Sequence, residues 1–525
     1  MVNKILVIRL GVIGDLILTS PAILNLKISF PRAKISLLTR NRFSSLARRL
    51  IGVDEIFDFP NKATLRDLYL MGEFLDNQNF DMIIDLHGNI RSQFLSKYVT
   101  ASIKGRYWKR SWERMAAVNW HWINPYPPHT VDLYNTAVTE AGGKVFARRP
   151  VLRLDDCEKK SIEFENNRPI IAIAPGASHQ PKKFPKERLR DIAIESFERF
   201  SANIVLFLVD DDADMESLGQ IIPRSNLKSF RNYDLNRLPC LISECDLMLC
   251  NDSGLMHMSS AVGTPVLGFF GPTHPTLGFS PRGLKDQIVE TDEYCRPCSR
   301  HGKQECFRDK QYCFENISDR MILNMISEAI KDNHKGDKAL FIDRDGTLIK
   351  DKNYMSNPAL VEPEEGSIDA VKLARKLGFK IIVVSNQSGV ARGYFDEQTV
   401  MQVNQKVMDI FKKAEAEIDG IYYCPHYQNG VEADYSFECS CRKPSAGMIE
   451  KASLEHQINP FRSYVIGDKP SDIQLAQVSG GKGILVRTGY GVKSEKDFEL
   501  SNLPPSIYIA DNLYEAVKYL ETNSN

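Results

Sequence analysis

The sequence predicts an α/β protein built from parallel sheets, and two observations carry this prediction. Continuous apolar runs that suit buried strands recur along the chain, separated by helical spacers and glycine-containing turns. The chain has 525 residues, which is too long for one core, since domains usually hold about 100 to 200 residues. We therefore expect about three domains.

The first 330 residues predict two Rossmann-like domains that face a cleft. Their strand-like runs are residues 4–10, 34–39, 80–88, 169–176, 203–210, 246–252 and 264–271. These runs form two groups that meet near residues 150–168, which gives domains at 1–160 and 161–330.

A polar stretch, KDNHKGDK, then predicts a linker at residues 331–337. The pattern restarts in a third α/β domain at residues 338–525. Its strand-like segments, each ending in a polar loop, are KALFIDRDGT, KIIVVSNQSG, SYVIGDKPSD and KGILVRTG.

Composition and charge favour a soluble globular protein. Apolar residues make up 43% of the chain, charged residues 26%, and the formal net charge is zero, so we expect no nucleic-acid partner. Residues 1–50 nevertheless carry nine Lys or Arg against one acid, Asp15. This excess fits either an ordinary solvated surface or contact with an anionic acceptor or lipid headgroups.

We expect a cytoplasmic protein, with peripheral contact to the inner membrane left open. No apolar run reaches the roughly 18 residues of a membrane span, and Arg9 and Asp15 interrupt the N-terminal run where a signal peptide would be apolar. The eleven cysteines fit this compartment as thiols or metal ligands rather than bridges.

Two carboxylates in FIDRDGTLI, Asp343 and Asp345, follow a strand at the spacing that aims both the same way. One can attack a phosphoryl group while the other protonates the leaving alkoxide and then activates water. Taken alone, the string also fits a calcium loop or a plain turn. Ser385, Lys443 and Asp468 then follow at the ends of later segments.

In this order, residues 338–490 resemble the HAD superfamily of phosphatases. The resemblance implies Asp343 as nucleophile and Asp345 as general acid and base. It assigns phosphate binding to Ser385, Asn386 and Lys443, and Mg²⁺ to Asp343, Asp468 and the carbonyl of Asp345. Asp472 has two interpretations. It orients either Lys469 or a water molecule bound to the metal, or it caps a helix.

Cys424, His426, Cys439 and Cys441 offer four soft ligands from two tight loops, as a closed structural zinc site requires. The alternative is three unrelated thiols and a surface histidine. The zinc loop narrows the resemblance to the heptose-1,7-bisphosphate 7-phosphatases and the histidinol-phosphate phosphatases. In this branch Arg392, in the segment RGYF, and Lys443 are candidates to bind the second phosphate of a bisphosphate substrate.

The N-terminal region carries GVIGD at 11–15, DLHGNIRS at 85–92, PGASHQPKKFP at 175–185 and a long NDSG segment at 251–273. In the NDSG segment a strand ends near Cys250 and a helix begins near Leu255, so backbone N–H groups suit a diphosphate. Gly254 permits close approach. Asp252 and Ser253 can cap the helix or bond a sugar, and His257 is either a ligand contact or a structural histidine.

These segments resemble family 9 glycosyltransferases, the heptosyltransferase-like enzymes of GT-B fold, over residues 1–330. The resemblance implies that Lys182 offsets the diphosphate charge and that Asp15 is the base for the acceptor; a helix cap is the other interpretation of Asp15. Phe184 replaces the family's usual Trp, which would keep an aromatic wall. Whether Cys295, Cys298, Cys306 and Cys313 bind a metal stays open.

We therefore expect a bifunctional enzyme. Its phosphatase removes the 7-phosphate of a heptose bisphosphate through an aspartyl-phosphate with Mg²⁺. Its transferase moves heptose from an ADP or GDP donor to a lipopolysaccharide-type or lipid-linked glycan acceptor. The alternative is a histidinol-phosphate or other sugar phosphatase fused to a sugar-nucleotide-binding module without transfer activity.

Overall fold

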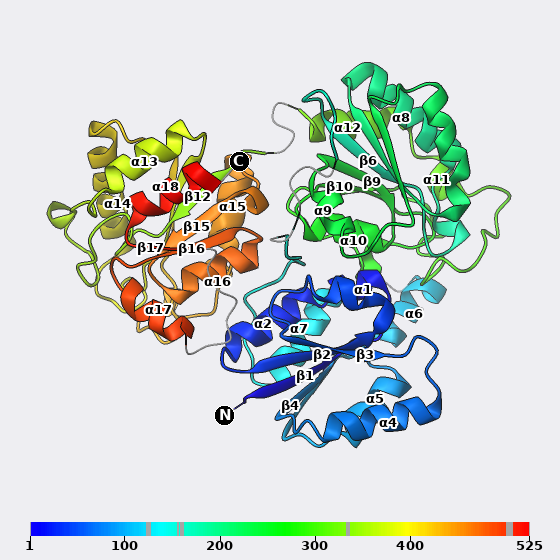
Figure 1. The fold of residues 1–525 in the computed structure, drawn as a ribbon, viewed down its shortest axis with the longest axis horizontal. Coiled ribbons are helices and arrows are strands. Elements are labelled where there is room, and N and C mark those ends of the chain that lie inside the picture. The colour runs from blue at the N-terminus through cyan, green and yellow to red at the C-terminus, as the bar shows by residue number, and fades with distance from the viewer. Residues whose placement is uncertain are drawn as a thin grey trace. The chain divides into compact units, whose positions relative to one another are not determined.

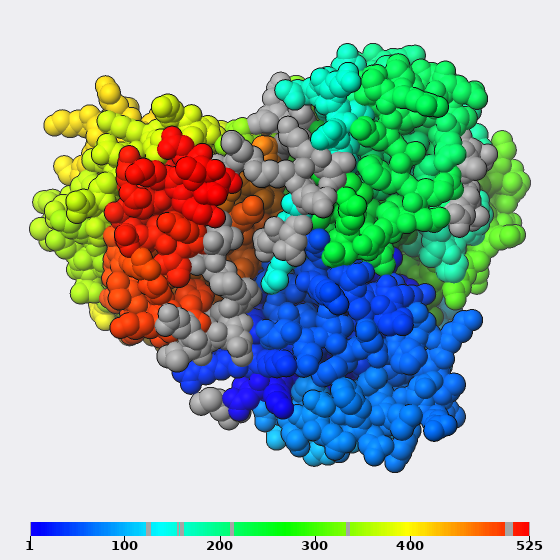
Figure 2. Space-filling view, viewed as in Figure 1, coloured from blue at the N-terminus to red at the C-terminus, as the bar shows by residue number. Residues whose placement is uncertain are grey.

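A computed structural model describes residues 2–121, 128–154, 157, 162–331, 336–499 and 508–523. The chain divides into two compact units, Met1–Lys335 and Gly336–Asn525. Residues 332–335 of the expected linker and the expected boundary at residue 160 lie outside the described residues. Within each unit, side chains fill the spaces between the ribbon elements (Figure 2). No helix in the described part of the chain is both long enough and apolar enough to cross a bilayer.

The first half of unit 1 is a parallel sheet in the order β3-β2-β1-β4-β5 (Figure 1). Its strands are β1 (Lys4–Ile8), β2 (Lys34–Arg40), β3 (Glu55–Phe59), β4 (Met82–Asp85) and β5 (Ile103–Arg106). The helices are α1 (Ile13–Ile17), α2 (Ser20–Ser29), α3 (Ser44–Ala47), α4 (Leu65–Asp76), α5 (Ile90–Tyr98), α6 (Ser111–Trp120) and α7 (Thr130–Glu140). Ile5 and Val7 of β1 face one core and Leu6 and Ile8 face the other, so both faces of the sheet are covered.

The second half is a parallel sheet in the order β11-β10-β9-β6-β7-β8. Its strands are β6 (Ile170–Ala174), β7 (Asn203–Leu208), β8 (Leu227–Arg231), β9 (Leu247–Asn251), β10 (Val266–Phe269) and β11 (Gln287–Val289). The helices are α8 (Lys186–Phe200), α9 (Leu238–Ser243), α10 (Gly254–Ala261), α11 (Tyr312–Glu315) and α12 (Asp319–Ala329).

The two halves meet where α1 approaches α10. A Cβ added to Gly14 would lie 2.9 Å from the His257 ring, and one added to Gly254 would lie 3.1 Å from Ile13. Both glycines are therefore needed for the close contact of these two helices.

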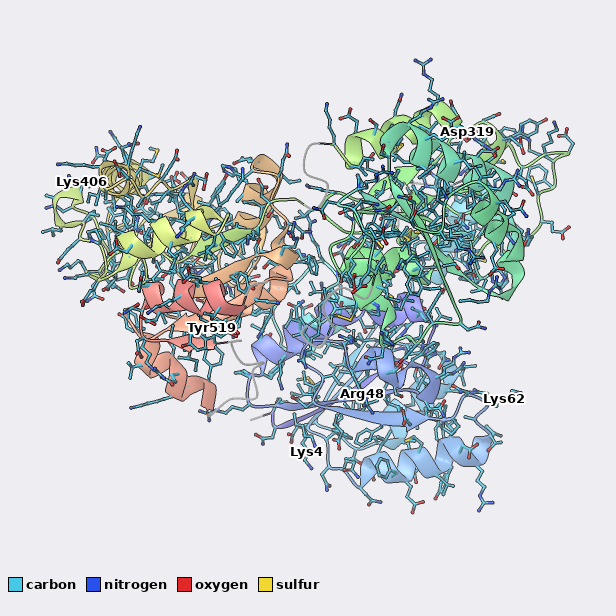
Figure 3. All side chains as sticks on the ribbon, turned by 45° about the horizontal axis from the view of Figure 1, so that its top comes forward. Lys4, Arg48, Lys62, Asp319, Lys406 and Tyr519 are labelled. Carbon is cyan, nitrogen blue, oxygen red and sulfur yellow. A yellow bond between two sulfur atoms is a disulfide. The ribbon has the colours of Figure 1, made fainter. Side chains whose placement is uncertain are left out.

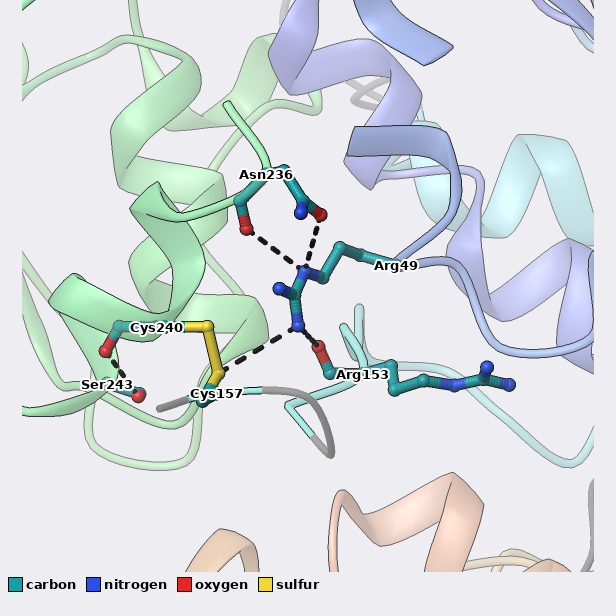
Figure 4. The surroundings of a disulfide bond; sticks show 6 residues. All are labelled: Arg49, Arg153, Cys157, Asn236, Cys240 and Ser243. Atoms are coloured by element: carbon teal, nitrogen blue, oxygen red, sulfur yellow. Dashed lines mark hydrogen bonds between the residues drawn. A yellow bond between two sulfur atoms is a disulfide. The ribbon is translucent and has the colours of Figure 1, made fainter. Parts of the chain in front are cut away.

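A second contact between the halves centres on Arg49 (Figure 4). Its Nε donates to the backbone and side-chain oxygens of Asn236, both at 3.1 Å, and its Nη1 donates to the carbonyl of Arg153 at 3.2 Å. Beside it, Cys157 and Cys240 form a disulfide across 83 residues. The expectation that no cysteine is bridged is therefore wrong for this pair, which the fold brings together from distant parts of the chain.

The basic excess of residues 1–50 does not form one surface. Lys4 and Arg48 are exposed (Figure 3), but Arg9, Lys27 and Arg49 are buried. Lys27 pairs with Asp54 at 2.6 Å, and Arg9 pairs with Asp15. Three of the nine basic residues are therefore internal and structural.

Unit 2 is a parallel sheet in the order β14-β13-β12-β15-β16-β17. Its strands are β12 (Ala339–Ile342), β13 (Lys380–Asn386), β14 (Gly420–Cys424), β15 (Tyr464–Gly467), β16 (Lys482–Val486) and β17 (Tyr508–Ala510). The helices are α13 (Ser367–Lys376), α14 (Glu397–Lys413), α15 (Gly447–Glu455), α16 (Pro470–Ser479), α17 (Gly491–Glu499) and α18 (Leu513–Asn523). The predicted α/β class with parallel sheets is confirmed.

Candidate active sites

The carboxylates of unit 2 follow its central strands. Asp343 comes directly after β12, and its N–H donates to the carbonyl of Ile466 in β15 at 2.9 Å. The chain turns directly after Asp345, where Gly346 adopts a φ of +91°. A side chain at Gly346 would also meet the Asp468 carboxylate at 2.7 Å. The carboxyl ends of β12 and β15 thus share one polar site.

Lys443 is buried among the carboxylates of this site. Its Nζ lies 2.5 Å from Asp343 Oδ1 and 2.6 Å from Asp472 Oδ1, and it donates to the carbonyl of Val384 at 3.0 Å. Burial alone would lower the pKa of Lys443, but the two carboxylates outweigh it and raise that pKa. Lys443 is therefore a fixed positive charge beside Asp343.

Three carboxylates outnumber this lysine. Oxygens of Asp343, Asp468 and Asp472 lie within 4.8 Å of one another, and all three residues are buried. Asp468 Oδ1 has no hydrogen-bond donor among the described residues and lies 3.6 Å from Lys469 Nζ. Burial, and then the charges of Asp343 and Asp472, raise the pKa of Asp468 to about 7. A hard divalent cation fits such a set of oxygen ligands.

Asp345 is held apart from this cluster. Arg344, 0% exposed, lies 3.0 Å from Asp345 Oδ2, and Gln387 Nε2 donates to the same oxygen at 2.8 Å. Gln387 also donates to Ser385 Oγ at 2.7 Å. The structure thus adds Arg344 and Gln387, which the sequence analysis missed. Their positions within FIDRDGT and VVSNQSG were the signal that could have identified them.

Asn386 contacts the backbone of Lys443 in both directions. Its Oδ1 accepts from the Lys443 N–H at 3.0 Å, and its Nδ2 donates to the Lys443 carbonyl at 3.3 Å. Asp472 accepts the Lys469 N–H at 3.1 Å as well as the Lys443 ammonium. Asp472 therefore combines an orienting role with that of a helix cap, while phosphate binding by Asn386 stays a prediction.

Cys424, His426, Cys439 and Cys441 come together in space, and Cys441 is two residues before Lys443. The Sγ atoms of Cys441 and Cys424 are 3.1 Å apart, those of Cys441 and Cys439 3.3 Å, and His426 Nδ1 lies 3.3 Å from Cys441 Sγ. Four ligand atoms this close, with no disulfide among them, fit a small tetrahedral ion such as zinc. Arg442 Nη1 donates to the His426 carbonyl at 3.0 Å and ties the two loops together.

The structure places Arg392 on the aromatic ring of Tyr427, with 4.2 Å from its guanidinium carbon to the ring centroid. Arg442 lies 5.1 Å from the same ring. Arg392 Nε is buried with no hydrogen-bond acceptor among the described residues. Both cations thus lie against the same aromatic ring, and the second-phosphate role of Arg392 stays a prediction.

In unit 1, Asp15 is at the third position of α1 and forms an ion pair with Arg9. Val12 occupies the N-cap position, so the structure does not support Asp15 as the cap. Arg9 is buried and also donates to the Leu86 carbonyl at 2.6 Å. Asp15 keeps 27% exposure, which leaves its carboxylate open to an acceptor.

Most of the residues predicted to bind the donor lie at or near the start of α10. Lys182 Nζ is 2.6 Å from Asp252 Oδ2, which also accepts from Thr273 Oγ1 at 2.8 Å. Ser253 is the N-cap of α10 but makes no cap bond, and its buried Oγ has no partner among the described residues. The N-terminus of α10, with Gly254 at its first position, thus keeps unpaired donors near a lysine.

His257 lies between the residues predicted for the donor and the predicted base Asp15. It is 5% exposed, and burial lowers its pKa to about 4, with Asp252, Asp15 and Lys182 as the nearby charges. His257 is therefore neutral at pH 7. Its position against Gly14 joins Asp15 to the residues of α10 in one site.

Phe184 does not line this site. It is 0% exposed and stacks on Phe269 at a centroid distance of 4.4 Å, with Phe314 at 5.5 Å. The expectation of an aromatic wall at Phe184 is therefore wrong, because the residue contributes to the core beneath the sheet.

The sequence analysis also assigned no role to His87 and Lys109, which both lie near Arg9. Burial and the charges of Arg9, Lys109 and Arg40 lower the pKa of His87 to about 3. Burial and the charge of Arg9 lower the pKa of Lys109, and the negative charge of Asp15 partly offsets this effect. These residues come from separate strand ends, so only the fold reveals them.

The second cysteine group differs from the first. Burial raises the pKa of the Cys298 thiol, and the neighbouring Cys295 and Cys306 add to this effect. Among the described residues, however, the two groups that bring at least three ligand atoms within 4.8 Å are the acidic and the cysteine-histidine clusters of unit 2. A metal at Cys295, Cys298, Cys306 and Cys313 therefore has no support from the geometry.

Comparison with known proteins matches both units. Residues 69–307 match the family model of glycosyltransferase family 9 (heptosyltransferase), and residues 440–516 match the HAD-hydrolase-like model. The D-glycero-beta-D-manno-heptose-1,7-bisphosphate 7-phosphatase of Haemophilus ducreyi is 41% identical over 162 residues, 30% of this chain and 88% of the relative. Unit 2 belongs to this family of HAD-like phosphatases. The chain thus joins a unit of this phosphatase family to a region that matches glycosyltransferase family 9.

A relative named for the other anomer is also similar. The D-glycero-alpha-D-manno-heptose-1,7-bisphosphate 7-phosphatase of Photorhabdus laumondii is 33% identical over 189 residues, 36% of this chain and 99% of the relative. The solved family 9 glycosyltransferase of Veillonella parvula is 20% identical, covers 62% of this chain and 97% of its own, and has a TM-score of 0.50. This likeness shows the GT-B fold.

Proposed function

We propose that unit 2 removes the 7-phosphate of D-glycero-D-manno-heptose 1,7-bisphosphate through an aspartyl-phosphate at Asp343. The observation that carries this proposal is the buried contact of Asp343 with Lys443, 2.5 Å apart, beside Asp468 and a separately held Asp345. The similarity to heptose-bisphosphate phosphatases supports the substrate.

In this mechanism Asp343 attacks phosphorus, and Asp345 donates a proton to the departing sugar oxygen. Asp345 then takes a proton from the water that hydrolyses the aspartyl-phosphate. Lys443 and Ser385 offset the charge of the phosphoryl oxygens. Asp343, Asp468 and the Asp345 carbonyl would hold Mg²⁺, which supplies further charge compensation when bound. Cys424, His426, Cys439 and Cys441 would hold a structural zinc ion.

We propose for unit 1 the transfer of heptose from a nucleotide donor, ADP- or GDP-heptose, to a lipopolysaccharide-type or other lipid-linked glycan. Asp15 would deprotonate the acceptor hydroxyl, while Lys182 and the α10 N-terminus would stabilise the departing diphosphate. The placement of Asp15, His257 and Asp252 around the α1 and α10 junction supports this assignment.

The domain division at 1–160, 161–330, 331–337 and 338–525 is part of this proposal. The separate sheets and the contact boundary between Lys335 and Gly336 support it. We also propose a cytoplasmic location, which the nine free cysteines support.

Phosphate release by the purified protein with Mg²⁺ tests the phosphatase, with both anomers of the heptose bisphosphate compared with histidinol phosphate. We expect the bisphosphate to be preferred by at least about 100-fold in kcat/KM, and Asp343→Asn to be inactive. Preference for histidinol phosphate would contradict the substrate. Donor binding without transfer to any acceptor would show that unit 1 is only a binding module.

A further inference from the structure

Unit 1 carries a concentrated set of exposed tryptophans. All four tryptophans of the chain fall within residues 108–122. Of the three in the described residues, Trp108 is 57% exposed, Trp112 61% and Trp120 59%. Exposed apolar side chains that cluster in this way mark binding surfaces. We name Trp108, Trp112 and Trp120 the tryptophan surface.

Two of the three tryptophans lie on a helix whose buried side is anchored. Trp112 and Trp120 are both on α6 (Figure 1), and their ring centroids are 5.6 Å apart. On its buried side, α6 is anchored by Arg114, which donates to Thr130 Oγ1 at 3.0 Å and lies over the Phe279 ring at 4.7 Å. The tryptophans are therefore not needed to attach the helix, and packing within the unit leaves them exposed.

Positive charge surrounds these rings. The segment KGRYWKR at residues 104–110 has four basic residues and no acid. The Arg106 guanidinium lies 4.7 Å from the Trp108 ring centroid, and Arg110 is exposed beside Trp112. Two carboxylates, Glu113 and Glu140, line the same pocket as Trp108 and Trp112, and Glu113 pairs with Arg110 at 3.0 Å, so basic residues still outnumber acidic ones here. Tryptophan next to Lys and Arg suits the headgroup region of an anionic bilayer.

The same segment leads into the transferase site. Lys109, which lies between Trp108 and Arg110 in sequence, interacts electrostatically with Arg9, Asp15 and Asp85. A bilayer that contacts Trp108 would therefore present the polar part of a lipid-anchored acceptor close to Asp15.

We propose that the tryptophan surface docks the protein onto the surface of an anionic phospholipid bilayer. The inference deepens the transferase half of the proposed function, because it assigns a place to the lipid part of the acceptor. Vesicle binding requires no turnover, so its failure is distinguishable from a failure of heptosyl transfer, which is measured in parallel on a deacylated, soluble acceptor.

The test uses the full chain with phosphatidylcholine vesicles, with and without phosphatidylglycerol. Because every tryptophan lies in residues 108–122, intrinsic emission reports on this segment alone. We expect cosedimentation at least about tenfold tighter with phosphatidylglycerol present, a blue shift of the emission, and quenching by brominated lipid.

Trp108→Ser/Trp112→Ser/Trp120→Ser should weaken vesicle binding at least about tenfold, and Arg110→Glu should reduce the preference for anionic lipid. The matched control is Tyr294→Ser/Phe307→Ser, which removes two aromatic side chains of the same unit that are 75% and 70% exposed. Circular dichroism and phosphate release check folding.

Three results would overturn the proposal: no binding to anionic vesicles, equal losses in the control, or an emission shift with a soluble oligosaccharide but none with vesicles. The last would identify the rings as a platform for sugars.

Discussion

At the scale of single residues, both sites depend on a cation that fixes a carboxylate. Lys443 contacts Asp343 and Asp472, and Arg9 contacts Asp15. Each cation is buried, so its charge is poorly screened and its loss would leave a carboxylate without a partner. The positioning groups therefore matter as much as the reacting ones.

Asp472→Asn should lower phosphatase kcat by about 10- to 100-fold, with a smaller change in KM, because Lys443 loses one of its two anionic partners. Steady-state phosphate release measures both constants. Asp369→Asn, a change in the first turn of α13, is the control. An unchanged kcat would show that Asp343 alone positions the lysine.

Asp15→Asn should lower heptosyl transfer by at least about 1,000-fold while donor binding stays within about threefold. Transfer assays and calorimetric donor binding separate the two effects, and phosphate release from unit 2 reports intact folding. Asp58→Asn, on β3 of the same half, is the matched control. Retained transfer in Asp15→Asn would exclude this residue as the base.

At the scale of elements, loops are held by local chemistry that does not take part in the reaction. The cysteine-histidine cluster fixes the loop that leads to Lys443. In unit 1, Asp286 accepts hydrogen bonds from Ser260 Oγ at 2.5 Å and from the Val266 N–H at 3.1 Å, and so ties α10 to β10.

Cys439→Ser should release the bound zinc and lower the melting temperature of unit 2 by more than about 10 °C, without affecting heptosyl transfer. Metal analysis and calorimetry measure the two effects. Cys306→Ser, from the second cysteine group, should change neither. Unchanged zinc content in Cys439→Ser would show that the cluster is not a metal site.

Ionisation of Asp286 should lower the free energy of unfolding of unit 1 as the pH rises from about 4 to 6. Burial raises the pKa of the folded Asp286 carboxyl to about 6, against 3.8 in the unfolded chain. The folded state therefore binds this proton more tightly, and the stabilisation is present below pH 4 and lost by pH 6. The free energy of unfolding, measured with urea, should fall less steeply with pH between about 4 and 6 in Asp286→Asn than in the unaltered protein. An identical slope would contradict the assignment.

At the scale of the whole molecule, the chain consists of two compact units, and the boundary between them lies between Lys335 and Gly336. Each has its own hydrophobic core. Every residue named for the phosphatase site lies in unit 2, so we expect fragment 336–525 to keep kcat/KM within about threefold of the full chain. Phosphate release measures this. A loss above tenfold would mean that unit 1 completes the phosphatase site.

The local pattern of the sequence determined the fold class, the central strands and most of the phosphatase site. β1, β9, β12 and β15 are covered on both faces and read as apolar runs, and the reacting groups follow them directly in sequence. The strands absent from the sequence analysis, β3, β5, β8, β11, β14 and β17, are the edges of the three sheets. Edge strands are shorter or more polar, so periodicity does not reveal them.

The tertiary structure decided which distant residues meet. The pairs Lys182 and Asp252, and Cys157 and Cys240, involve groups whose partners no local pattern specifies. It also buried Phe184 in the core and left the tryptophan surface exposed. Local propensity and hydrophobic pattern fix what each segment becomes, whereas burial, pairing of charges and exposure depend on how the segments pack together.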